Sequence, residues 1–441
     1  MSRRNLLILL VTVVVSYACY LRGERNPFAR YTAEGLDTIE QGSLEAVPNR
    51  ELFDGAMRGM VGVLHKHGDQ HSQYLNEAEA NPLRSEIHQQ FGGIGVRIGF
   101  LGEQHQLAIV APPDQGTPAA RAKLQPGDFI LAINDQPTDG IKMSDVLRLV
   151  RGEPGSVLRL KIESPSESAP RTVDLVREVI NTESVLGDRR DKDGSWQFRL
   201  ESDPQIAVIR ITSFGDRTAA EFANVMTKLT AEGVRAIVLD LRNNPGGSLD
   251  AAVAVCQMLL PAGKTIVETR GREQALLHRY ATTADGRFMD VPMAVLVDQN
   301  SASAAEIVAA CLQDHGRAIV VGQRSYGKGT VQQLLPLETG KSLLKLTWAS
   351  FWRPSGANIH HAVGATDNAK WGVSPDAGHE SKLSPEEYKT YLDYREKRDG
   401  FGVIDETSHA DPDTVAKLAG FADKPLQLAV ESLQSKLNGK P

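Results

Sequence analysis

Short apolar runs alternate with helical stretches through the second half of this sequence, and that alternation constrains its fold most. The runs at 206–211, 236–241 and 293–297 read as strands. Between them, 219–230 places apolar residues on one helical face, and 249–260 also reads as a helix. Strands that alternate with helices predict a sheet covered by helices, in the α/β or α+β class.

A serine and a lysine follow the last of these runs. Ser303 begins an alanine-rich helical stretch and forms an S-x-x-E capping box with Glu306. Lys328 lies beyond another apolar strand, between Gly327 and Gly329, which predicts a close backbone approach to some other group. A helix cap explains the serine but not the lysine, and a serine near a lysine can be a nucleophile with its base.

Two motifs carry a resemblance to a known family. Ser-Ala-Ser-Ala-Ala-Glu-Ile at 301–307 and Val-Gly-Gln-Arg-Ser-Tyr-Gly-Lys-Gly-Thr-Val-Gln-Gln at 321–333 resemble the catalytic core of the C-terminal processing (tail-specific) serine peptidases. That family uses a Ser/Lys dyad on a crotonase-like fold. The resemblance implies that Ser303 is the nucleophile, Lys328 is the general base and Gln332 holds the lysine in place.

The stretch Asp-Leu-Arg-Asn-Asn-Pro-Gly-Gly at 240–247 lies at the C-terminal end of a predicted strand, where ligand chemistry gathers in open α/β sheets. Its two glycines let a backbone N–H point into the site. Similarity to the family places one oxyanion-hole donor at Gly246 or Gly247 and the other at the N–H of Ala304. A helix that starts at Ser303 adds a positive end for the developing oxyanion.

Residues 88–178 resemble a PDZ domain. The stretch 91–96 reads as a glycine-rich turn leading into a strand, 124–135 matches the PDZ pattern, and 143–151 is the predicted helix beside the peptide groove. The N–H groups of such a turn can hold a carboxylate, and an edge strand can accept an added strand. The expected peptide-binding residues are Phe91, Gly92, Gly93, Ile94, Gly95, Val96, Val146, Leu147 and Val150.

The first 21 residues read as a targeting segment. Arg3 and Arg4 precede an apolar run from 6 to 21, and Ser16-Tyr17-Ala18 offers a small-x-small cleavage site. A signal peptide and a membrane anchor both fit this pattern. Either one predicts an exported protein body, periplasmic or anchored to the cytoplasmic membrane and facing outward.

The expected domains combine these observations. They are a signal peptide or anchor at 1–21, a helical segment at 32–87, the PDZ domain at 88–178 inserted before a peptidase domain at 181–376, and a polar extension at 377–441 that ends in a helix. A surface hairpin or linker is expected at 187–194. Residues 360–371 look longer than is usual in the family, and 377–415 lack a clear counterpart.

Composition and charge limit the kinds of binding partner and cofactor to be expected. A net charge of −6 over 441 residues gives no reason to expect nucleic acid, and three cysteines are too few for a disulfide framework. The resemblance implies no metal or other cofactor, and the close spacing of His65, His67 and His71 is interpreted as a solvated helix end rather than as a metal site. The expected partners are proteins or peptides with accessible C-termini, and an oligomer is compatible with the sequence.

Three rival functions fit parts of the sequence. Gly322 to Lys328 nearly spells a nucleotide-binding P-loop, but Gly329 follows where Ser or Thr is needed for Mg²⁺. Ser342 and Lys345 have the S-x-x-K spacing of penicillin-binding enzymes, but they fall in a predicted strand, where positions three apart face opposite sides. The remaining alternative is a catalytically silent PDZ scaffold or chaperone.

Overall fold

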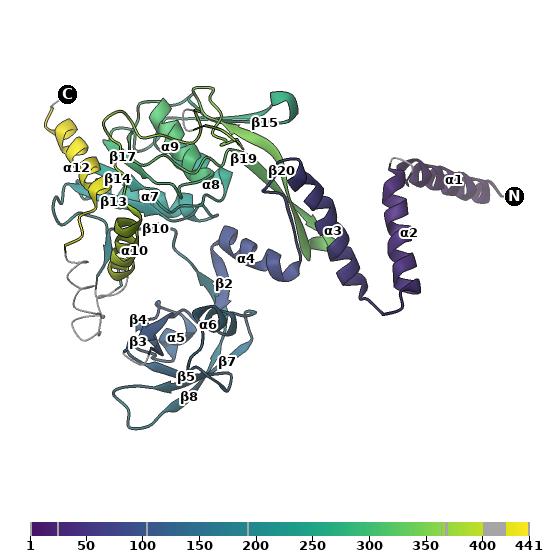
Figure 1. The fold of residues 1–441 in the computed structure, drawn as a ribbon, viewed down its shortest axis with the longest axis horizontal. Coiled ribbons are helices and arrows are strands. Elements are labelled where there is room, and N and C mark those ends of the chain that lie inside the picture. The colour runs from purple at the N-terminus through teal and green to yellow at the C-terminus, as the bar shows by residue number, and fades with distance from the viewer. Residues whose placement is uncertain are drawn as a thin grey trace. The chain divides into compact units, whose positions relative to one another are not determined.

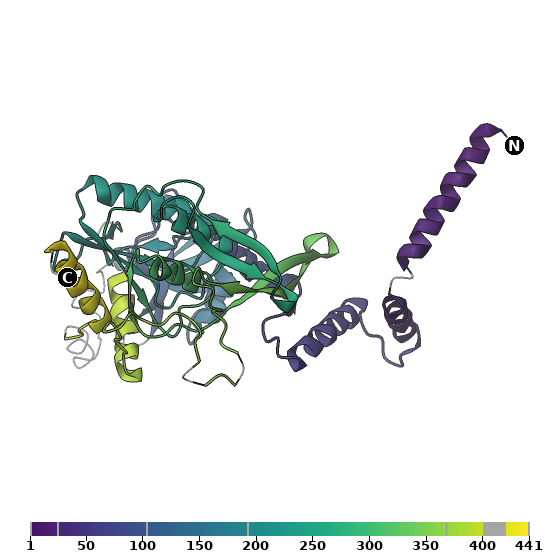
Figure 2. The same cartoon turned by 90° about the horizontal axis from the view of Figure 1, so that it is seen from above.

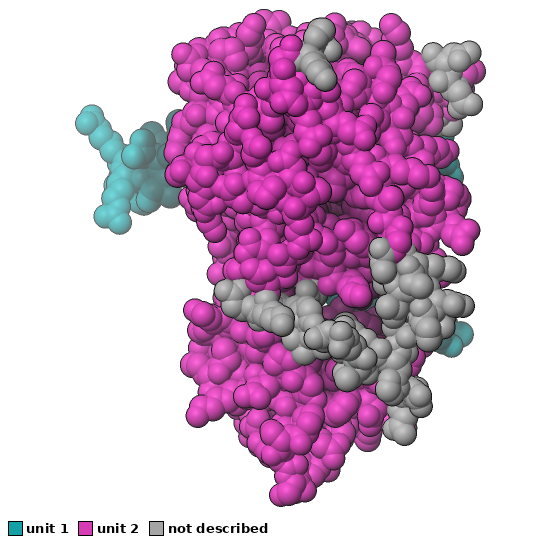
Figure 3. All heavy atoms as spheres, turned by 90° about the vertical axis from the view of Figure 1, so that its left-hand side faces the viewer, with its two compact units in different colours: residues 1–80, 332–347 teal, residues 81–331, 348–441 magenta. Residues whose placement is uncertain are grey.

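The computed structural model describes residues 2–23, 26–102, 105–191, 194–362, 364–366, 369–399 and 420–439. Part of the hairpin predicted at 187–194 and part of the extension predicted at 377–441 lie outside these ranges. The chain divides into two compact units (Figure 3). One unit comprises Met1–Ala80 with Gln332–Thr347, and the other comprises Asn81–Val331 with Trp348–Pro441.

The smaller unit is mainly helical. It contains α1 (Arg3–Gly23), α2 (Pro27–Gly42), α3 (Asn49–Lys66), β1 (Gln73–Leu75), the start of α4 (Glu77–His88), most of β19 (Thr330–Leu337), the short 3-10 turn η2 (Glu338–Gly340) and the first half of β20 (Ser342–Trp352). Strand β1 pairs antiparallel with β20 and sets Tyr74 opposite Leu344. The Tyr74 hydroxyl donates to Asp54 of α3 at 2.7 Å, which fastens the strand to the helix. In the part of the chain that the structure describes, no helix is both long and apolar enough to cross a membrane.

The larger unit contains an antiparallel sheet of six strands, in the order β3-β4-β5-β7-β8 with β6 beside β5. Its elements are β3 (Arg97–Leu101), β4 (Gln106–Ala111), α5 (Pro118–Arg121), β5 (Phe129–Ile133), β6 (Gln136–Pro137), α6 (Met143–Val150), β7 (Val157–Glu163) and β8 (Arg171–Val176). Leu158, Leu160 and Ile162 alternate with exposed residues along β7 and are buried, as one-sided burial of a strand requires. Strand β3 forms one edge of the sheet.

The same unit contains a second sheet, in the order β10-β13-β14-β17-β18, whose last four strands run parallel. The strands are β10 (Val185–Leu186), β13 (Ile206–Ile211), β14 (Ala236–Asp240), β17 (Met293–Val297) and β18 (Ile319–Gly322), and the helices between them are α7 (Thr218–Ala231), α8 (Leu249–Gln257) and α9 (Ala304–Asp314). The strands read as continuous apolar runs because both faces of this sheet are covered.

The two faces have different covers. Ala207 and Ile209 belong to the core shared with α7, α8 and α9, whereas Ile206 and Val208 belong to a second core with Ala429. Ala429 lies on α12 (Lys424–Leu437), the last helix of the chain. Helix α12 therefore covers the face that the other three helices leave open, where it contacts β14, β17 and β18. Its place beside β14 and β17 is visible in Figure 1.

The remaining elements surround this sheet or connect it to the rest of the unit. They are β2 (Gln90–Gly93), β9 (Glu178–Asn181), β11 (Arg189–Arg190), β12 (Trp196–Gln197), β15 (Thr265–Arg270), η1 (Arg272–Gln274), β16 (Leu276–Ala281) and α10 (Pro385–Asp399). Helix α10 lies beside the start of α12 (Figures 1 and 2), and Lys424 donates to Glu387 of α10 at 2.6 Å. These two helices bring the end of the chain back to the parallel sheet.

Candidate active site

Four loops follow the carboxyl ends of β13, β14, β17 and β18, and they meet at one edge of the parallel sheet because the strands run the same way. Three of these loops carry residues singled out from the sequence. Ser303 follows β17, Lys328 follows β18, and the stretch from Asp240 to Gly247 follows β14. The fold therefore brings the Ser-Ala-Ser, Gly-Lys-Gly and Pro-Gly-Gly motifs to the same edge.

Ser303 occupies a strained backbone conformation, with φ 55° and ψ −115°, between β17 and α9. A residue with a side chain in such a sparsely populated region costs about 1–3 kcal/mol, and such strain clusters at active sites. A sharp strand-to-helix turn of this kind presents a serine hydroxyl in other hydrolases. The next N–H, that of Ala304, has no hydrogen-bond partner among the described residues, so it remains open to an anionic oxygen.

Glu306 joins the serine turn to the lysine loop. Its Oε2 accepts the backbone N–H of Ser303 and that of Lys328, both at 2.8 Å. Its Oε1 accepts the Ser325 hydroxyl at 2.5 Å and the Gly327 N–H at 2.7 Å. Burial raises the pKa of the Glu306 carboxyl, and these four hydrogen bonds oppose the rise. One carboxylate thus fixes the backbone at both predicted catalytic residues.

The sequence revealed only a part of this arrangement. The S-x-x-E spacing predicts the contact between Ser303 and Glu306, which the structure confirms. The other three donors to Glu306 lie 19 to 22 residues downstream, in a loop whose path the spacing does not determine. A glutamate within the otherwise apolar, buried stretch 304–312 is a signal that could have indicated further partners, since a carboxylate is almost never fully buried without them.

The glycines around Lys328 allow a close approach of another segment, as the sequence predicts. A Cβ on Gly329 would lie 2.2 Å from the backbone nitrogen of His360, and one on Gly327 would lie 2.7 Å from the His361 Cβ. The N–H of His361 donates to the Gly327 carbonyl at 2.8 Å. The start of the unusually long 360–371 segment therefore packs against the lysine loop.

The two candidate glycines of the oxyanion hole differ. The Gly246 N–H donates to the side-chain oxygen of Asn244 at 2.8 Å, so it is already engaged. The Gly247 N–H has no partner within the described ranges. Gly246 lies directly against the serine, because a Cβ placed on it would be 2.7 Å from the Ser303 Cβ and 2.9 Å from the Ala304 nitrogen. Gly247 is thus the better candidate donor, and Gly246 is the residue whose small size lets the loop approach the serine.

Gln332 lies on β19, in the smaller unit. Its amide nitrogen donates to the Thr347 hydroxyl at 3.2 Å, and that hydroxyl donates to Asp69 at 2.9 Å. Asp69 also accepts the Ser72 hydroxyl, at 2.5 Å. Gln332 therefore belongs to a polar network of its own unit, and its role in holding Lys328 stays a prediction.

The predicted peptide-binding turn is partly a strand. Phe91, Gly92 and Gly93 pair with β9 within β2, and only 94–96 form the connection to β3. The turn prediction was therefore wrong for the first three residues. Gly92 is required there by packing, because a Cβ on it would lie 1.9 Å from the Gly152 carbonyl oxygen. Gly95 keeps the predicted turn character with φ 73°.

The predicted helix beside the groove forms as α6, one residue shorter than expected. Val146 and Val150 are buried in the core of the six-stranded sheet, whereas Leu147 is 42% exposed. Of the three residues expected to line a pocket, Leu147 is thus the one that an incoming peptide can reach. The neighbouring edge of the sheet is formed by β3, the strand expected to pair with a substrate tail.

The chain is similar to known proteins. Residues 205–377 match the model of peptidase family S41, and residues 109–164 match a PDZ domain. A carboxy-terminal-processing protease of Bartonella bacilliformis is 32% identical over 387 residues, covering 86% of this chain and 81% of that protein. The carboxy-terminal processing protease CtpB of Bacillus subtilis is 28% identical over 349 residues, covering 79% and 69%. The solved photosystem II D1 C-terminal processing protease covers 80% of this chain and 92% of its own, with 25% identity and a TM-score of 0.44.

Proposed function

The chain belongs to peptidase family S41 and is a serine peptidase of the C-terminal processing type, and from this we propose that it cleaves proteins selected by their C-terminal tails, with Ser303 and Lys328 as the catalytic pair. The predicted fold class is confirmed, namely a mixed α/β chain with a peptidase domain, a PDZ domain and a helical N-terminal segment. The observation that supports the dyad best is the shared bonding of Ser303 and Lys328 to Glu306.

The proposed reaction is acyl transfer through the serine hydroxyl. The neutral Lys328 amine takes the proton of Ser303 Oγ, which attacks the scissile carbonyl carbon and gives a tetrahedral oxyanion. That oxyanion is held by the N–H groups of Ala304 and Gly247. Lys328 returns the proton to the departing amine as the C–N bond breaks, which leaves an acyl-enzyme. Water, deprotonated by the same lysine, then releases the new C-terminal carboxylic acid.

The decisive test is degradation of casein by the purified protein and by the variants Ser303→Ala and Lys328→Arg. We expect turnover by the wild type and a loss of at least about 10³-fold in each variant, as for removal of a triad member in other serine peptidases. Thermal unfolding controls for folding of the variants. A folded wild type that binds tail peptides but cleaves nothing would leave the silent scaffold as the better description.

We also propose that the protein body is exported, with residues 1–21 as the targeting segment. Two arginines ahead of the apolar run in α1 support this. Alkaline phosphatase fused after residue 441 gains activity only outside the cytoplasm, so an active fusion is expected. A stronger signal from a cytoplasmic reporter at the same position would contradict export.

A further inference from the structure

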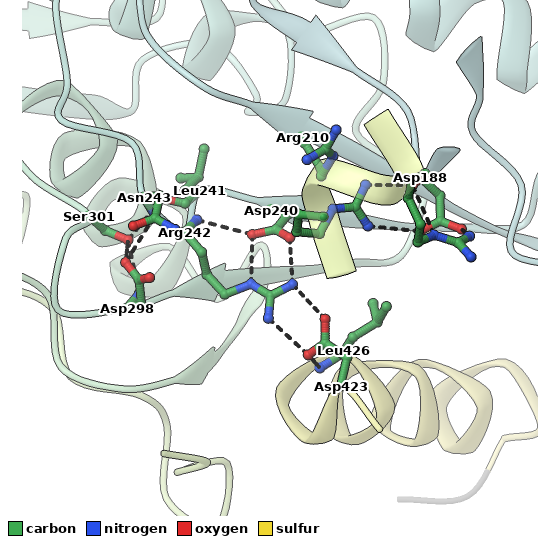
Figure 4. A network of polar contacts seen from close by, with 12 residues as sticks. Asp188, Arg210, Asp240, Leu241, Arg242, Asn243, Asp298, Ser301, Asp423 and Leu426 are labelled. Carbon is green, nitrogen blue, oxygen red and sulfur yellow. Dashed lines mark hydrogen bonds and ion pairs between the residues drawn. The ribbon is translucent and has the colours of Figure 1, made fainter. Parts of the chain in front are cut away.

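The loop that follows β14 is attached to the last helices of the chain through a buried ion network (Figure 4). Arg242 donates to the Asp240 carboxylate at 2.7 and 3.0 Å and to both oxygens of Asp423 at 2.9 Å. Asp423 is the N-cap of α12 and also accepts the Leu426 N–H. The three charged side chains are only 3 to 7% exposed.

The buried guanidinium of Arg242 is kept charged by the carboxylates around it. Burial alone lowers the pKa of Arg242, but the two facing carboxylates outweigh it and raise the pKa above its usual value. The guanidinium therefore stays charged, and the ring of Tyr391 on α10 lies 4.5 Å from its carbon. Loss of Asp423 would leave Arg242 paired with Asp240 alone, and buried guanidinium N–H groups would lose their acceptors, which costs free energy.

A second contact reaches the same loop from α10. The Tyr388 hydroxyl donates to the side-chain oxygen of Asn243, the residue after Arg242. The Asn300 amide donates to both Tyr388 and Asn243, at 2.7 and 2.8 Å. Asn300 lies three residues before Ser303, so one tyrosine contacts both the loop after β14 and the loop that leads to the serine.

These contacts continue to the predicted oxyanion hole. The carbonyl of Asn244 accepts the Ala302 N–H at 2.9 Å, while its side chain holds the Gly246 N–H and donates to the Ile211 carbonyl at 2.7 Å. A shift of Arg242 and Asn243 would therefore move Asn244, and with it the Gly246–Gly247 peptide. Oxyanion donors act only at hydrogen-bond distance from the developing charge, which makes catalysis sensitive to small displacements here.

We propose that α10 and α12 form a C-terminal clamp on the loop 240–247, with Asp423 and Tyr388 as positioning residues for the oxyanion hole. The clamp rests on the proposed function, because it assumes that this loop supplies an oxyanion donor. Its contacts come from α10 and from the start of α12, which lie beyond the 205–377 match to the peptidase family. The clamp thus assigns a part in catalysis to helices that lie far from Ser303 in sequence.

A merely structural role for α12 must be separated from this proposal, since the helix also packs on the sheet. Asp423→Asn removes the charge and keeps the shape, whereas Leu433→Ala on the same helix weakens packing through a fully buried residue without contacting Arg242. Tyr388→Phe removes only the hydroxyl. All variants are compared as full-length protein at a temperature where circular dichroism shows each to be folded.

The measurements are kcat and KM for a fluorogenic peptide, together with the affinity of a peptide boronate that forms a tetrahedral anion on the serine. For Asp423→Asn we expect kcat and boronate affinity to fall together by about 10- to 100-fold, with KM within about threefold of the wild type. A smaller fall in the same direction is expected for Tyr388→Phe. Leu433→Ala should lower the melting temperature and leave kcat near the wild-type value.

Two results would separate failure of the clamp from failure of the proposed function. A wild type whose cleavage does not depend on Ser303 overturns the proposed function. A Ser303-dependent wild type whose kcat is unchanged in folded Asp423→Asn, or is lowered equally by Leu433→Ala at matched stability, overturns the clamp alone.

Discussion

The Glu306 carboxylate accepts the backbone N–H of Lys328 at 2.8 Å, across a sequence separation of 22 residues. The same oxygen accepts the N–H of Ser303, so one buried side chain sets the backbone positions on both sides of the proposed dyad. The arrangement makes Glu306 the first residue to test after the dyad itself.

Replacing Glu306 with glutamine should impair both folding and activity. The four groups that contact Glu306 donate hydrogen bonds to its two oxygens. In glutamine one oxygen is replaced by an NH₂ group, which must face at least one of these donors, so that a hydrogen bond becomes a repulsive contact. We expect about 1–3 kcal/mol of lost stability, measured by urea unfolding, and a fall in kcat of at least about tenfold where the variant is folded. Glu232→Gln, at an exposed position, is the control and should change neither quantity.

The pH dependence of stability tests the state of Glu306 separately. Burial raises the pKa of this carboxyl above its usual value of 4.5, so the folded state retains its proton to higher pH than the unfolded state does. The stabilising contribution of Glu306 to the free energy of unfolding is therefore present below about pH 4.5 and is lost as the pH rises through the raised pKa. The difference in unfolding free energy between wild type and Glu306→Gln should shrink with rising pH across that window. A difference that grows with pH would mean that the hydrogen bonds dominate and that the pKa is lowered.

Lys328→Arg should be inactive, because a guanidinium does not give up its proton at accessible pH. Activity of the wild type should rise along a single limb above neutrality, since only the neutral amine can accept the serine proton. Initial rates from about pH 6 to about pH 10 on the same peptide measure this. Substantial turnover by Lys328→Arg would exclude the lysine as the base.

Gly246→Ala should abolish activity by steric contact with Ser303. Gly246 has φ 100°, and the added Cβ would meet the Ser303 Cβ at 2.7 Å. Gly233 has a comparable φ of 79° with nothing within 4 Å of an added Cβ, so Gly233→Ala carries the backbone strain of about 1–2 kcal/mol without the contact. The Cβ added at Gly246 would also lie 2.8 Å from the Ala302 carbonyl oxygen and 2.9 Å from the Ala304 nitrogen, so we expect a lower melting temperature for Gly246→Ala than for Gly233→Ala. At a temperature where both variants are folded, kcat should be lost in Gly246→Ala alone.

Substrate tails provide the test of the PDZ domain. One substrate is prepared with an apolar C-terminal residue as the free carboxylate and as the amide, which lacks the charge that backbone N–H groups would hold. Cleavage of the amide should be markedly slower, and a tail ending in Asp or Lys should slow as well, because burying an unpaired charge is costly. Equal rates for all versions would make the domain a spacer.

The sequence predicted the parallel sheet well because its strands are buried on both faces. Strands β13 and β17 have the predicted bounds, Ile206–Ile211 and Met293–Val297. A strand that is covered by helices on both faces is apolar along its whole length, so its ends are where the apolar run ends. Gly92 and Gly93 were predicted to form a turn but lie in β2. A glycine in a sequence can indicate either a turn or a close contact with another backbone segment. At Gly92 it is a close contact, with the Gly152 carbonyl, which the sequence alone does not reveal.

Helix α10 was not predicted, for a physical reason. Its buried residues are Tyr391 and Arg395, and it is held by ion pairs and ring contacts rather than by an apolar stripe. Hydrophobic periodicity therefore has nothing to detect in it. Hydrophobic periodicity likewise does not predict that Arg242 pairs with Asp423 or that Asn243 bonds to Tyr388, because these contacts are polar.

The separation of Arg242 and Asp423, 181 residues along the chain, has a consequence for the order of events during synthesis. Ribosomes make Ser303, Lys328 and the loop 240–247 long before α12, and domains begin to fold while the rest of the chain is still being made. A nascent or truncated chain would hold a complete dyad beside an arginine without its second carboxylate. On the proposed clamp, such a chain should cleave substrate more slowly than a chain that includes Asp423, so that full activity would follow the synthesis of α12.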